Sequence, residues 1–547
     1  MAYDPLHDGR MLGAMSRRGF LGATVLAGGV GVPWTADRAG STRGSTLDVR
    51  DVGAIGDGRT KSTRAIQRAI DLAHELGGGI VQLPAGTWLS GTLQLRSHVT
   101  IDLAPGAVLL ASPDDDDFAP HEPLPFQTGS DVETTDFAQA LLAGRDLERV
   151  AIRGAGVIDM NRDRRFGPKP IALKRCRFVT VQGITILRSP NYCVSLGGCD
   201  DALIEGVTVR TAYADGLDAD CCRRVRIANC DIESDDDALC LKTSFLLGAR
   251  GTTEDVVVTN CRLRSPSNCF KLGTESTGDF RQIVLSNCVF SGRLPEDHDA
   301  SAAAEGGGIA ILTVDGGTID GVMVSNVVMR DVAAPLFVRL GNRGRDQRQP
   351  APGRLRNVVI SGIMATGATD TGSIGGLPGH PVEGVTIENV RIAAAGGARR
   401  RAGLDVPERA AQYPEVTMYG DLPAFGLYLR HALDVSLRNV ELTVEHADAR
   451  PALVADDVAG LHVARLAGWP GERMGPLVWL HDVRGGLVEG GIAPEGSAAL
   501  LRVTGENTRR VTLVGTAYGP RESVDLAAEV APTAVLHATG SFAVARR

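Results

Sequence analysis

Apolar and polar positions alternate in a repeated pattern along most of the chain. The unit reads apolar-x-apolar-x-(Asn or Gly)-apolar-x-apolar, as in VRIANCDI (225–232) and VVVTNCRL (256–263). Alternation predicts a strand with one buried face on each side of the central residue, and Asn or Gly there admits the left-handed backbone of a bend. Two short strands about a bend, repeated many times, predict an all-β fold, a right-handed single-stranded parallel β-helix. The central residues are Gly183, Gly206, Asn229, Asn260, Asn287, Asn326, Gly362, Asn389 and Asn439.

The spacing of the pattern separates a β-helix from a β-sandwich. Successive central residues lie between 23 residues (Gly183 to Gly206) and 50 residues (Asn389 to Asn439) apart. A sandwich would instead show turn signals about every 8–12 residues. The longer steps predict loops expelled from single coils, and such loops commonly form the walls of a binding cleft.

The ten cysteines all lie between Cys176 and Cys288. A disulfide framework would be scattered along the chain, and no CxxC pair with an HxxxH partner suggests zinc. Cys230, Cys261 and Cys288 each follow a central asparagine. In stacked coils these cysteines would line an interior column, while amides of the asparagines before them bond along the stack. We therefore predict buried core cysteines and no metal site.

One amphipathic helix is predicted near the start of the repeat, over Thr60–Glu75, because its apolar residues form a helical stripe. Ser62 or Thr63 is expected to cap its N-terminus, and the glycines at 77–79 to end it. We expect this helix to cap the open end of the β-helix, which would otherwise expose apolar surface and strand edges.

Three regions are predicted along the chain. Residues 1–39 contain SRRGFL (16–21) before a mild apolar run, a pattern typical of a twin-arginine export signal and leader. Residues 46–467 are predicted to form the parallel β-helix catalytic domain, and residues 468–547 further coils or a closing sheet. The export signal predicts a periplasmic or extracellular protein, and no apolar run is long enough to predict a membrane span.

The charge of the chain limits the kinds of molecule that it is expected to bind. The net charge is −8 and the pI is near 5.8, whereas nucleic-acid-binding surfaces are usually basic. We expect a polysaccharide or oligosaccharide substrate, no nucleic acid, no cofactor and a monomer.

Clustered aspartates carry the candidate chemistry. Asp215 ends one predicted coil, and Asp236 and Asp237 end the next, so Asp215 and Asp236 should project from adjacent levels of one face. Carboxylates that crowd together raise at least one pKa, which leaves an acid beside a base. Glycoside hydrolysis needs this pair, one group to protonate the leaving oxygen and one to activate water. The alternatives are a solvated acidic turn, which we expect for residues 114–117, or a calcium site.

From Thr46 to Asp315 the sequence resembles family 28 of the glycoside hydrolases, the polygalacturonase-like enzymes. DVGAIGDGRTKSTRAIQRAI (51–70) and GGIVQLPAGTWLSGTLQL (78–95) match the opening shared by pectate-lyase-like β-helices. The family's Asn-Thr-Asp motif aligns with residues 213–215, and its Gly-Asp-Asp motif with residues 235–237. The resemblance implies that the middle aspartate of 235–237 is the general acid. It also implies that the aspartates at 215 and 237 hold and activate water, with inversion of the anomeric carbon.

Two departures from the family concern substrate recognition. The Gly-His-Gly position falls near residues 267–269, which are Ser-Asn-Cys, and the Arg-Ile-Lys position falls near residues 310–312, which are Ala-Ile-Leu. A site without that Arg and Lys loses its charge-assisted partners for a uronate. Other polar residues on the following coils are the candidates for substrate binding: Lys271, Glu275, Asp315, Arg339 and Arg343.

A late segment, residues 413–431, holds three of the seven tyrosines. We interpret it as a packed loop that anchors an insertion, with sugar binding by Tyr419, Arg430 or His431 as the alternative. The inserts at 113–140, 243–252, 291–307 and 340–355 favour a blocked pocket and exo action.

Two other functions fit the predicted fold. A polysaccharide lyase or epimerase would need Ca²⁺ or Arg to neutralise a uronate, and the acidic cluster offers oxygen ligands for calcium. A non-catalytic carbohydrate-binding β-helix would need no special register of carboxylates. The register of the two aspartate motifs favours the hydrolase over both.

Overall fold

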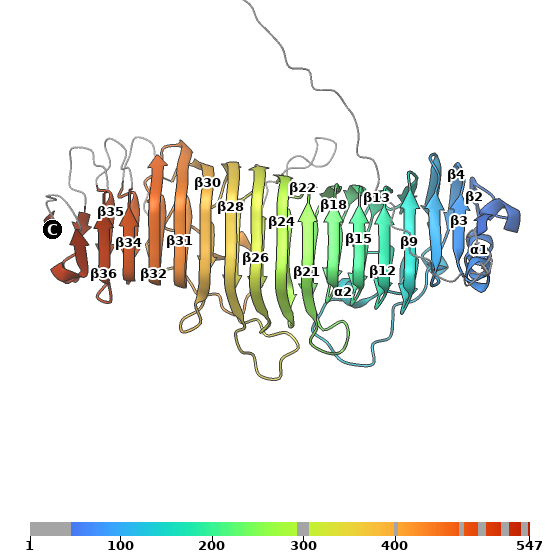
Figure 1. Cartoon of the computed structure of the whole chain (residues 1–547), viewed down its shortest axis with the longest axis horizontal. Coiled ribbons are helices and arrows are strands. Elements are labelled where there is room, and N and C mark those ends of the chain that lie inside the picture. Colours follow the sequence, from blue (N-terminus) through green and yellow to red (C-terminus); the bar gives the residue numbers. More distant parts are fainter. Residues whose placement is uncertain are drawn as a thin grey trace, which may run out of the picture. The chain divides into compact units, whose positions relative to one another are not determined.

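The computed structural model describes residues 45–292, 306–398, 403–469, 475–490, 499–515, 524–537 and 545–546. The predicted leader, residues 1–39, lies outside these residues. The compact unit that contains the described residues begins at Gly44. Its strands pair in parallel, each with the strand one coil before it and one coil after it, so that they form a long stack (Figure 1). This arrangement confirms the predicted right-handed parallel β-helix.

Each complete coil contributes strands to three columns. The first column contains β1 (Ser45–Asp48), β3 (Gly79–Leu83), β6 (Val99–Leu103), β9 (Glu148–Gly154), β12 (Arg177–Gln182), β15 (Asp200–Glu205), β18 (Arg223–Ala228) and β21 (Thr252–Thr259). The second contains β2 (Asp57–Lys61), β4 (Gly86–Ser90), β7 (Ala107–Ala111), β10 (Val157–Asp159), β13 (Thr185–Ser189), β16 (Thr208–Ala212), β19 (Asp231–Ser234) and β22 (Arg262–Arg264). The third contains β5 (Leu93–Gln94), β8 (Ala140–Arg145), β11 (Lys169–Lys174), β14 (Val194–Gly197), β17 (Leu217–Asp220), β20 (Leu239–Thr243), β23 (Phe270–Ser276), β25 (Gly307–Thr313), β27 (Ala334–Leu340) and β29 (Gly372–Gly375).

Later coils join the first two columns into long strands. These are β24 (Asp279–Ser291), β26 (Thr318–Arg330), β28 (Arg354–Ala368) and β30 (Val382–Gly396). The next two strands, β31 (Leu427–His446) and β32 (Leu453–Trp469), also include the third column at their start. Beyond residue 468 the parallel pairing continues through β33 (Val478–His481), β34 (Arg484–Glu489), β35 (Leu501–Thr504), β36 (Arg509–Val514), β37 (Val524–Leu526), β38 (Val535–His537) and β39 (Ala545–Arg546).

The central asparagines and glycines of the repeat make the bend between the first two columns. Asn229 and Asn439 have φ angles of 58° and 52°, in the left-handed region. Asn260 donates from Nδ2 to Oδ1 of Asn229 at 3.4 Å, as the stacking of the coils predicts. The adjacent Cys261 is buried in the core, and all ten cysteines are free thiols. The predicted bends and interior cysteines are therefore confirmed.

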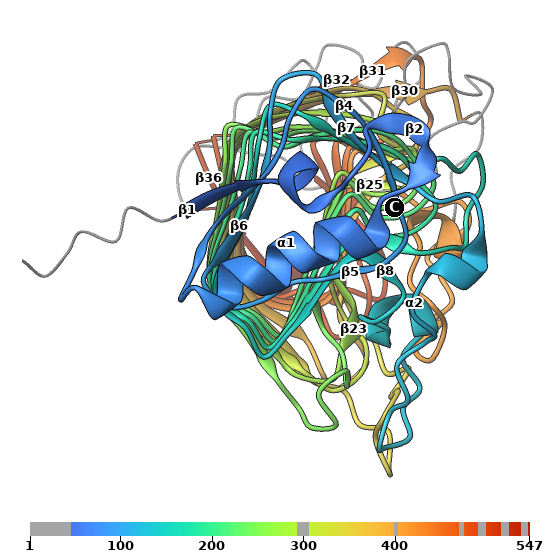
Figure 2. The same ribbon diagram turned by 90° about the vertical axis from the view of Figure 1, so that its right-hand side faces the viewer.

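The predicted helix is α1 (Thr63–Glu75). Its apolar face packs on β1, β3, β5 and β6, and it lies across the end of the coils in Figure 2. Ser62 occupies the N-cap position, one of the two predicted, but its side chain makes no capping hydrogen bond. Its Oγ instead donates to the carbonyl oxygen of Ile55 at 2.9 Å and accepts from the Ile55 amide at 3.0 Å. No helix among the described residues combines the length and the apolar character needed to cross a bilayer.

The third column differs from the first in how its outer face is covered. Every residue of β17, β20, β23, β25 and β27 is buried, although only alternate side chains point into the core. In β18 of the first column, exposed residues alternate with buried ones. Segments expelled from the coils, among them 113–139, 244–251 and 341–353, account for this difference because they pack on the third column.

Candidate active site

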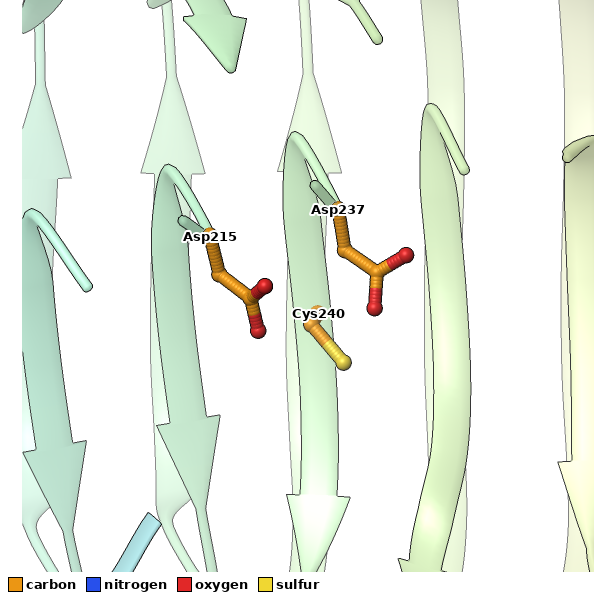
Figure 3. Close-up of side chains that lie close together, drawn as sticks. All are labelled: Asp215, Asp237 and Cys240. Atoms are coloured by element: carbon orange, nitrogen blue, oxygen red, sulfur yellow. The ribbon is translucent and has the colours of Figure 1, made fainter. Parts of the chain in front are cut away.

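Asp215 and Asp237 occupy equivalent positions on adjacent coils. Leu217 of β17 pairs with Leu239 of β20, and each aspartate lies two residues before its leucine. The Gly216 amide donates to the Asp237 carbonyl at 2.9 Å, which extends the pairing past the strand ends. The two carboxylates and the Cys240 thiol each place one atom within 4.8 Å of the others (Figure 3).

This register corrects the expectation that Asp236 lies directly above Asp215. The step from one coil to the next is one residue longer here than the step from Asp215 to Asp236. Asp237 therefore takes the position above Asp215. Gly216 permits the close approach: a Cβ at this residue would lie 2.5 Å from the carbonyl oxygen of Ala238. Asp236 stays near enough for its charge to raise the pKa of Asp215.

Asp237 is held by three side chains of the next coil. Lys271 Nζ donates to Oδ2 at 2.7 Å, while Asn268 Nδ2 and Ser267 Oγ donate to Oδ1 at 2.7 and 3.3 Å. Asn268 is one of the residues near which the resemblance places the family's Gly-His-Gly. Both oxygens of Asp237 therefore act as acceptors, one from the lysine and the other from the amide and the hydroxyl.

Asp215 shares a buried lysine with Asp218. Lys242 Nζ lies 2.7 Å from Asp215 Oδ2 and 2.6 Å from Asp218 Oδ1. Burial raises the pKa of Asp215 well above its usual value although Lys242 opposes the shift, and neighbouring carboxylates reinforce it. The Lys242 ammonium group also lies over the ring of Tyr192, 3.9 Å from the ring centroid. This part of the site therefore holds a carboxyl group that favours protonation beside a fixed cation.

Asp236 faces a different environment from its two partners. Its side chain is 28% exposed and accepts from Arg165 Nη1 at 2.7 Å, and the same guanidinium contacts Glu133 at 3.0 Å. Burial raises the pKa of Asp236, but Lys271 and Arg165 lower it by more, so that this pKa lies below its usual value. Its carbonyl oxygen accepts from Ser234 Oγ at 2.9 Å, which fixes the turn.

Of the five predicted substrate-binding residues, Lys271 lies on the aspartate cluster, as described above. Glu275, four residues further along β23, is buried, and Lys242, Arg343 and Lys271 lower its pKa against the opposing effect of burial. Arg345, which sequence reasoning missed, links Glu275 to Asp131 with contacts of 3.0 Å to each.

The other three predicted residues make framework contacts, and their binding of substrate stays a prediction. Arg343 pairs with Asp315 at 2.6 Å, and Asp315 is almost fully buried. Arg339 is 2% exposed and donates to the carbonyl oxygens of Gly376 and Glu408 at 3.0 and 2.6 Å. These contacts anchor the loops that cover the third column.

The late tyrosine-containing segment reaches the site through a residue that was not singled out. Tyr413 accepts from Lys271 Nζ at 3.2 Å and is 46% exposed. The residues named for sugar binding lie elsewhere: Tyr419 packs against the Arg339 guanidinium, Arg430 donates to the Val406 carbonyl, and His431 contacts Asp457 at 2.6 Å. These contacts favour the anchoring role for most of the segment.

The place of the family's Arg-Ile-Lys is apolar here. Ala310 and Leu312 are buried on the outer face of β25 and pack with Phe337 and Val416. No cation therefore projects from residues 310–312 toward a substrate carboxylate. The cations near the aspartates are instead Lys242, Lys271 and Arg165, each already paired with a carboxylate.

Comparison with known proteins agrees with this geometry. Residues 128–411 match the family described as "Glycosyl hydrolases family 28", and residues 46–106 match "Rhamnogalacturonase A/epimerase, pectate lyase-like". The chain is 28% identical to a "Probable polygalacturonase" of Vitis vinifera, over 66% of this chain and 77% of the relative. It is 22% identical to an "Exopolygalacturonase" of Zea mays, over 66% and 86%. An exopolygalacturonase structure from Thermotoga maritima aligns with a TM-score of 0.55 at 20% identity, over 72% of this chain and 91% of that one.

The fold and the carboxylate cluster define a carbohydrate-active enzyme of the parallel β-helix class, an O-glycosyl hydrolase. Because the family match covers more than half of the chain, the protein belongs to glycosyl hydrolase family 28.

Proposed function

We propose that the protein cleaves glycosidic bonds of a pectin-like polysaccharide or oligosaccharide with inversion at the anomeric carbon. Asp236 acts as the general acid, and Asp215 and Asp237 together hold and activate the attacking water. The polygalacturonase names of the relatives support a pectic substrate.

The main support is the pairing of Asp215 with Asp237 across adjacent coils. Two carboxylates this close can both accept from one water molecule, and the ionised member can take its proton as the water attacks. Lys242 and Lys271 hold the pair in place, because each ammonium group contacts one of its two members at 2.7 Å. Asp236 lies in the same turn as Asp237, but its side chain faces Arg165. It can therefore act on the opposite side of the scissile bond from the Asp215–Asp237 pair.

The acid role requires a change at Asp236 when substrate binds. In the free protein Lys271 and Arg165 both favour its ionised form, against the opposing effect of burial. Arg165 also contacts Glu133 and can keep that partner when a sugar separates it from Asp236. Loss of the guanidinium contact and exclusion of water then raise the pKa of Asp236, so that it takes up the proton it delivers to the leaving oxygen.

The proposal includes a location outside the cytoplasmic membrane. It rests on the twin-arginine pattern at residues 16–21 and on the size of polysaccharide substrates. A monomeric state remains part of the same proposal.

Asp236→Asn tests the mechanism. We expect kcat to fall by about 10²- to 10⁴-fold with little change in substrate binding, because an amide cannot donate the proton. Reducing-sugar release from a panel of pectic and neutral polysaccharides measures the loss, and NMR of the first product identifies its anomer.

Asp235→Asn is the matched control, the same chemical change one residue away, and should keep most of the activity. Equal activity of the two variants would exclude Asp236 as the acid. Products that absorb in the ultraviolet would indicate an unsaturated sugar and therefore a lyase.

A further inference from the structure

A cavity of about 380 Å³ lies beside the aspartate cluster. This volume is within the range of about 300–1,000 Å³ that is typical of ligand sites. The residues of its wall that bear on its ligand are Asp131, Val132, Glu133, Asp136, Phe166 and Asn191.

The cavity adjoins the proposed reaction centre along the stack of coils. Asn191 is followed by Tyr192, which takes the position equivalent to Asp215 one coil earlier, since Val194 pairs with Leu217. On another side, Glu133 contacts Arg165, which in turn contacts Asp236. A sugar in the cavity would therefore be a neighbour of the unit that is cleaved.

Two exposed apolar side chains lie at the mouth of the cavity. Phe166 is 68% exposed and Val132 is 59% exposed. The apolar face of a pyranose can stack on an exposed aromatic ring such as that of Phe166. The Arg165 guanidinium lies 5.7 Å from the Phe166 centroid and connects this platform to Asp236.

The charge of the wall indicates which sugar fits. Three carboxylates, those of Asp131, Glu133 and Asp136, line the cavity, and the two arginines beside it, Arg345 and Arg165, are already paired with Asp131 and Glu133 at 3.0 Å, so neither is free to bind a uronate. Asp136 already accepts from His121 and from the amide of Glu122, at 2.8 and 2.9 Å. Carboxylates accept hydrogen bonds from hydroxyl groups but repel another carboxylate in a confined space.

We propose that this cavity is a subsite for a neutral sugar unit next to the scissile bond, with Phe166 as its stacking platform. The inference rests on the proposed function for its place beside Asp236. It also agrees with the apolar residues found where the family has Arg-Ile-Lys. The substrate would then be a pectic chain that carries a neutral residue at this position.

Calorimetry with an inactive parent tests the subsite apart from catalysis. Asp237→Asn is the parent, because Asp237 contacts neither the cavity nor Arg165. The probes are tetragalacturonate and the same tetrasaccharide with its carboxyl groups reduced to hydroxymethyl groups. We expect the reduced probe to bind more tightly. Adding Phe166→Ala should weaken its binding about tenfold, through loss of buried apolar contact.

Two further variants sharpen the test. Phe178→Ala makes the same change at an exposed phenylalanine of β12 in the first column and should not alter binding. Val132→Lys places an ammonium group at the mouth and should shift the preference toward tetragalacturonate. Equal binding of both probes, or equal effects of Phe166→Ala and Phe178→Ala, would overturn the proposal. If binding behaves as expected but the wild type hydrolyses no polysaccharide, the subsite stands and the proposed function fails.

Discussion

The first and third columns of the same coils carry similar charged residues in very different surroundings. On the first column, Arg224 pairs with Asp201 of the coil before it, and their side chains are 45% and 28% exposed. On the third column, Lys242 pairs with Asp218 of the coil before it, and these side chains are 4% and 3% exposed. One repeat therefore produces an ordinary surface ion pair on one face and a buried one on another.

The segments that leave the coils create this difference. Leu246 packs with Phe137 against the outer side of β8 and β11, and Phe245 meets Phe126 edge to face at 5.8 Å. These contacts join the 121–139 and 244–251 segments over the third column. Electrostatic interactions strengthen where water is excluded, which gives the buried face its capacity for catalysis.

Removing one partner from each pair should show the largest contrast. Lys242→Met leaves Asp215 and Asp218 buried without their cation, and we expect a loss of about 3–5 kcal/mol in the free energy of unfolding. Arg224→Met, the matched change on the first column, should cost no more than about 1 kcal/mol. Urea denaturation followed by circular dichroism measures both.

A second substitution checks the cause of that loss. Adding Asp218→Asn to Lys242→Met should restore part of the stability, since one uncompensated charge is removed. If Lys242→Met and Arg224→Met lose equal stability, the covering segments do not give the two ion pairs different surroundings.

The two columns should also respond to pH in opposite directions. Burial raises the pKa of Asp220 to about 6, although hydrogen bonds from Ser244 oppose the shift. Its stabilising contribution is complete below the unfolded pKa of about 3.9 and is lost as the pH rises through about 6. Asp201 on the first column behaves in the reverse sense, because Arg224 lowers its pKa and its contribution is lost as the pH falls.

Asp220→Asn isolates the third-column effect. The amide keeps an acceptor and a donor for Ser244 but cannot ionise. Relative to the wild type, the unfolding free energy of the variant should therefore rise by about 2–3 kcal/mol between pH 4 and pH 7. Denaturation curves at several pH values measure the difference, and a constant difference across this range would contradict the buried titration of Asp220.

The same contrast explains which features could be predicted from the sequence. The bends at Asn229 and Asn439 and the clustering of three aspartates follow from the local pattern and from the stacking of coils. Both could therefore be predicted from this one sequence. The register of Asp215 against Asp237 depends on the length of a single turn, which the repeat does not specify. Lys242 was within reach of prediction, because it lies two residues after Cys240 and so faces the same side of β20.

The contacts made by the expelled segments were out of reach. Arg165 meets Asp236 across 71 residues of sequence, and Arg345 meets Asp131 across 214. Inserts have no periodicity, so nothing in their sequence relates them to a particular coil. Part of the electrostatics of the site therefore depends on residues that the repeat does not place.

The smallest expected effect concerns the tether between two of these segments. Arg345 joins Asp131 to Glu275, and the Gly129 amide donates to the neighbouring Asp346 at 2.7 Å. Arg345→Met should cost about 1 kcal/mol or less, because its side chain is partly exposed. It should nevertheless speed hydrogen exchange of the amides at 128–131, since a local opening needs only these contacts to break.

The tether also bears on the expected exo action. If it closes one end of the cleft, the wild type should release mainly the smallest product at early times, and Arg345→Met should release a larger share of long fragments. Arg348→Met, an exposed arginine of the same segment, is the control and should change neither exchange nor products. A product pattern that is the same in both variants would separate the tether from exo action while leaving its structural role intact. In that case the inserts of the third column would act only by excluding water from the carboxylates, and chain-end selection would have to arise elsewhere in the cleft.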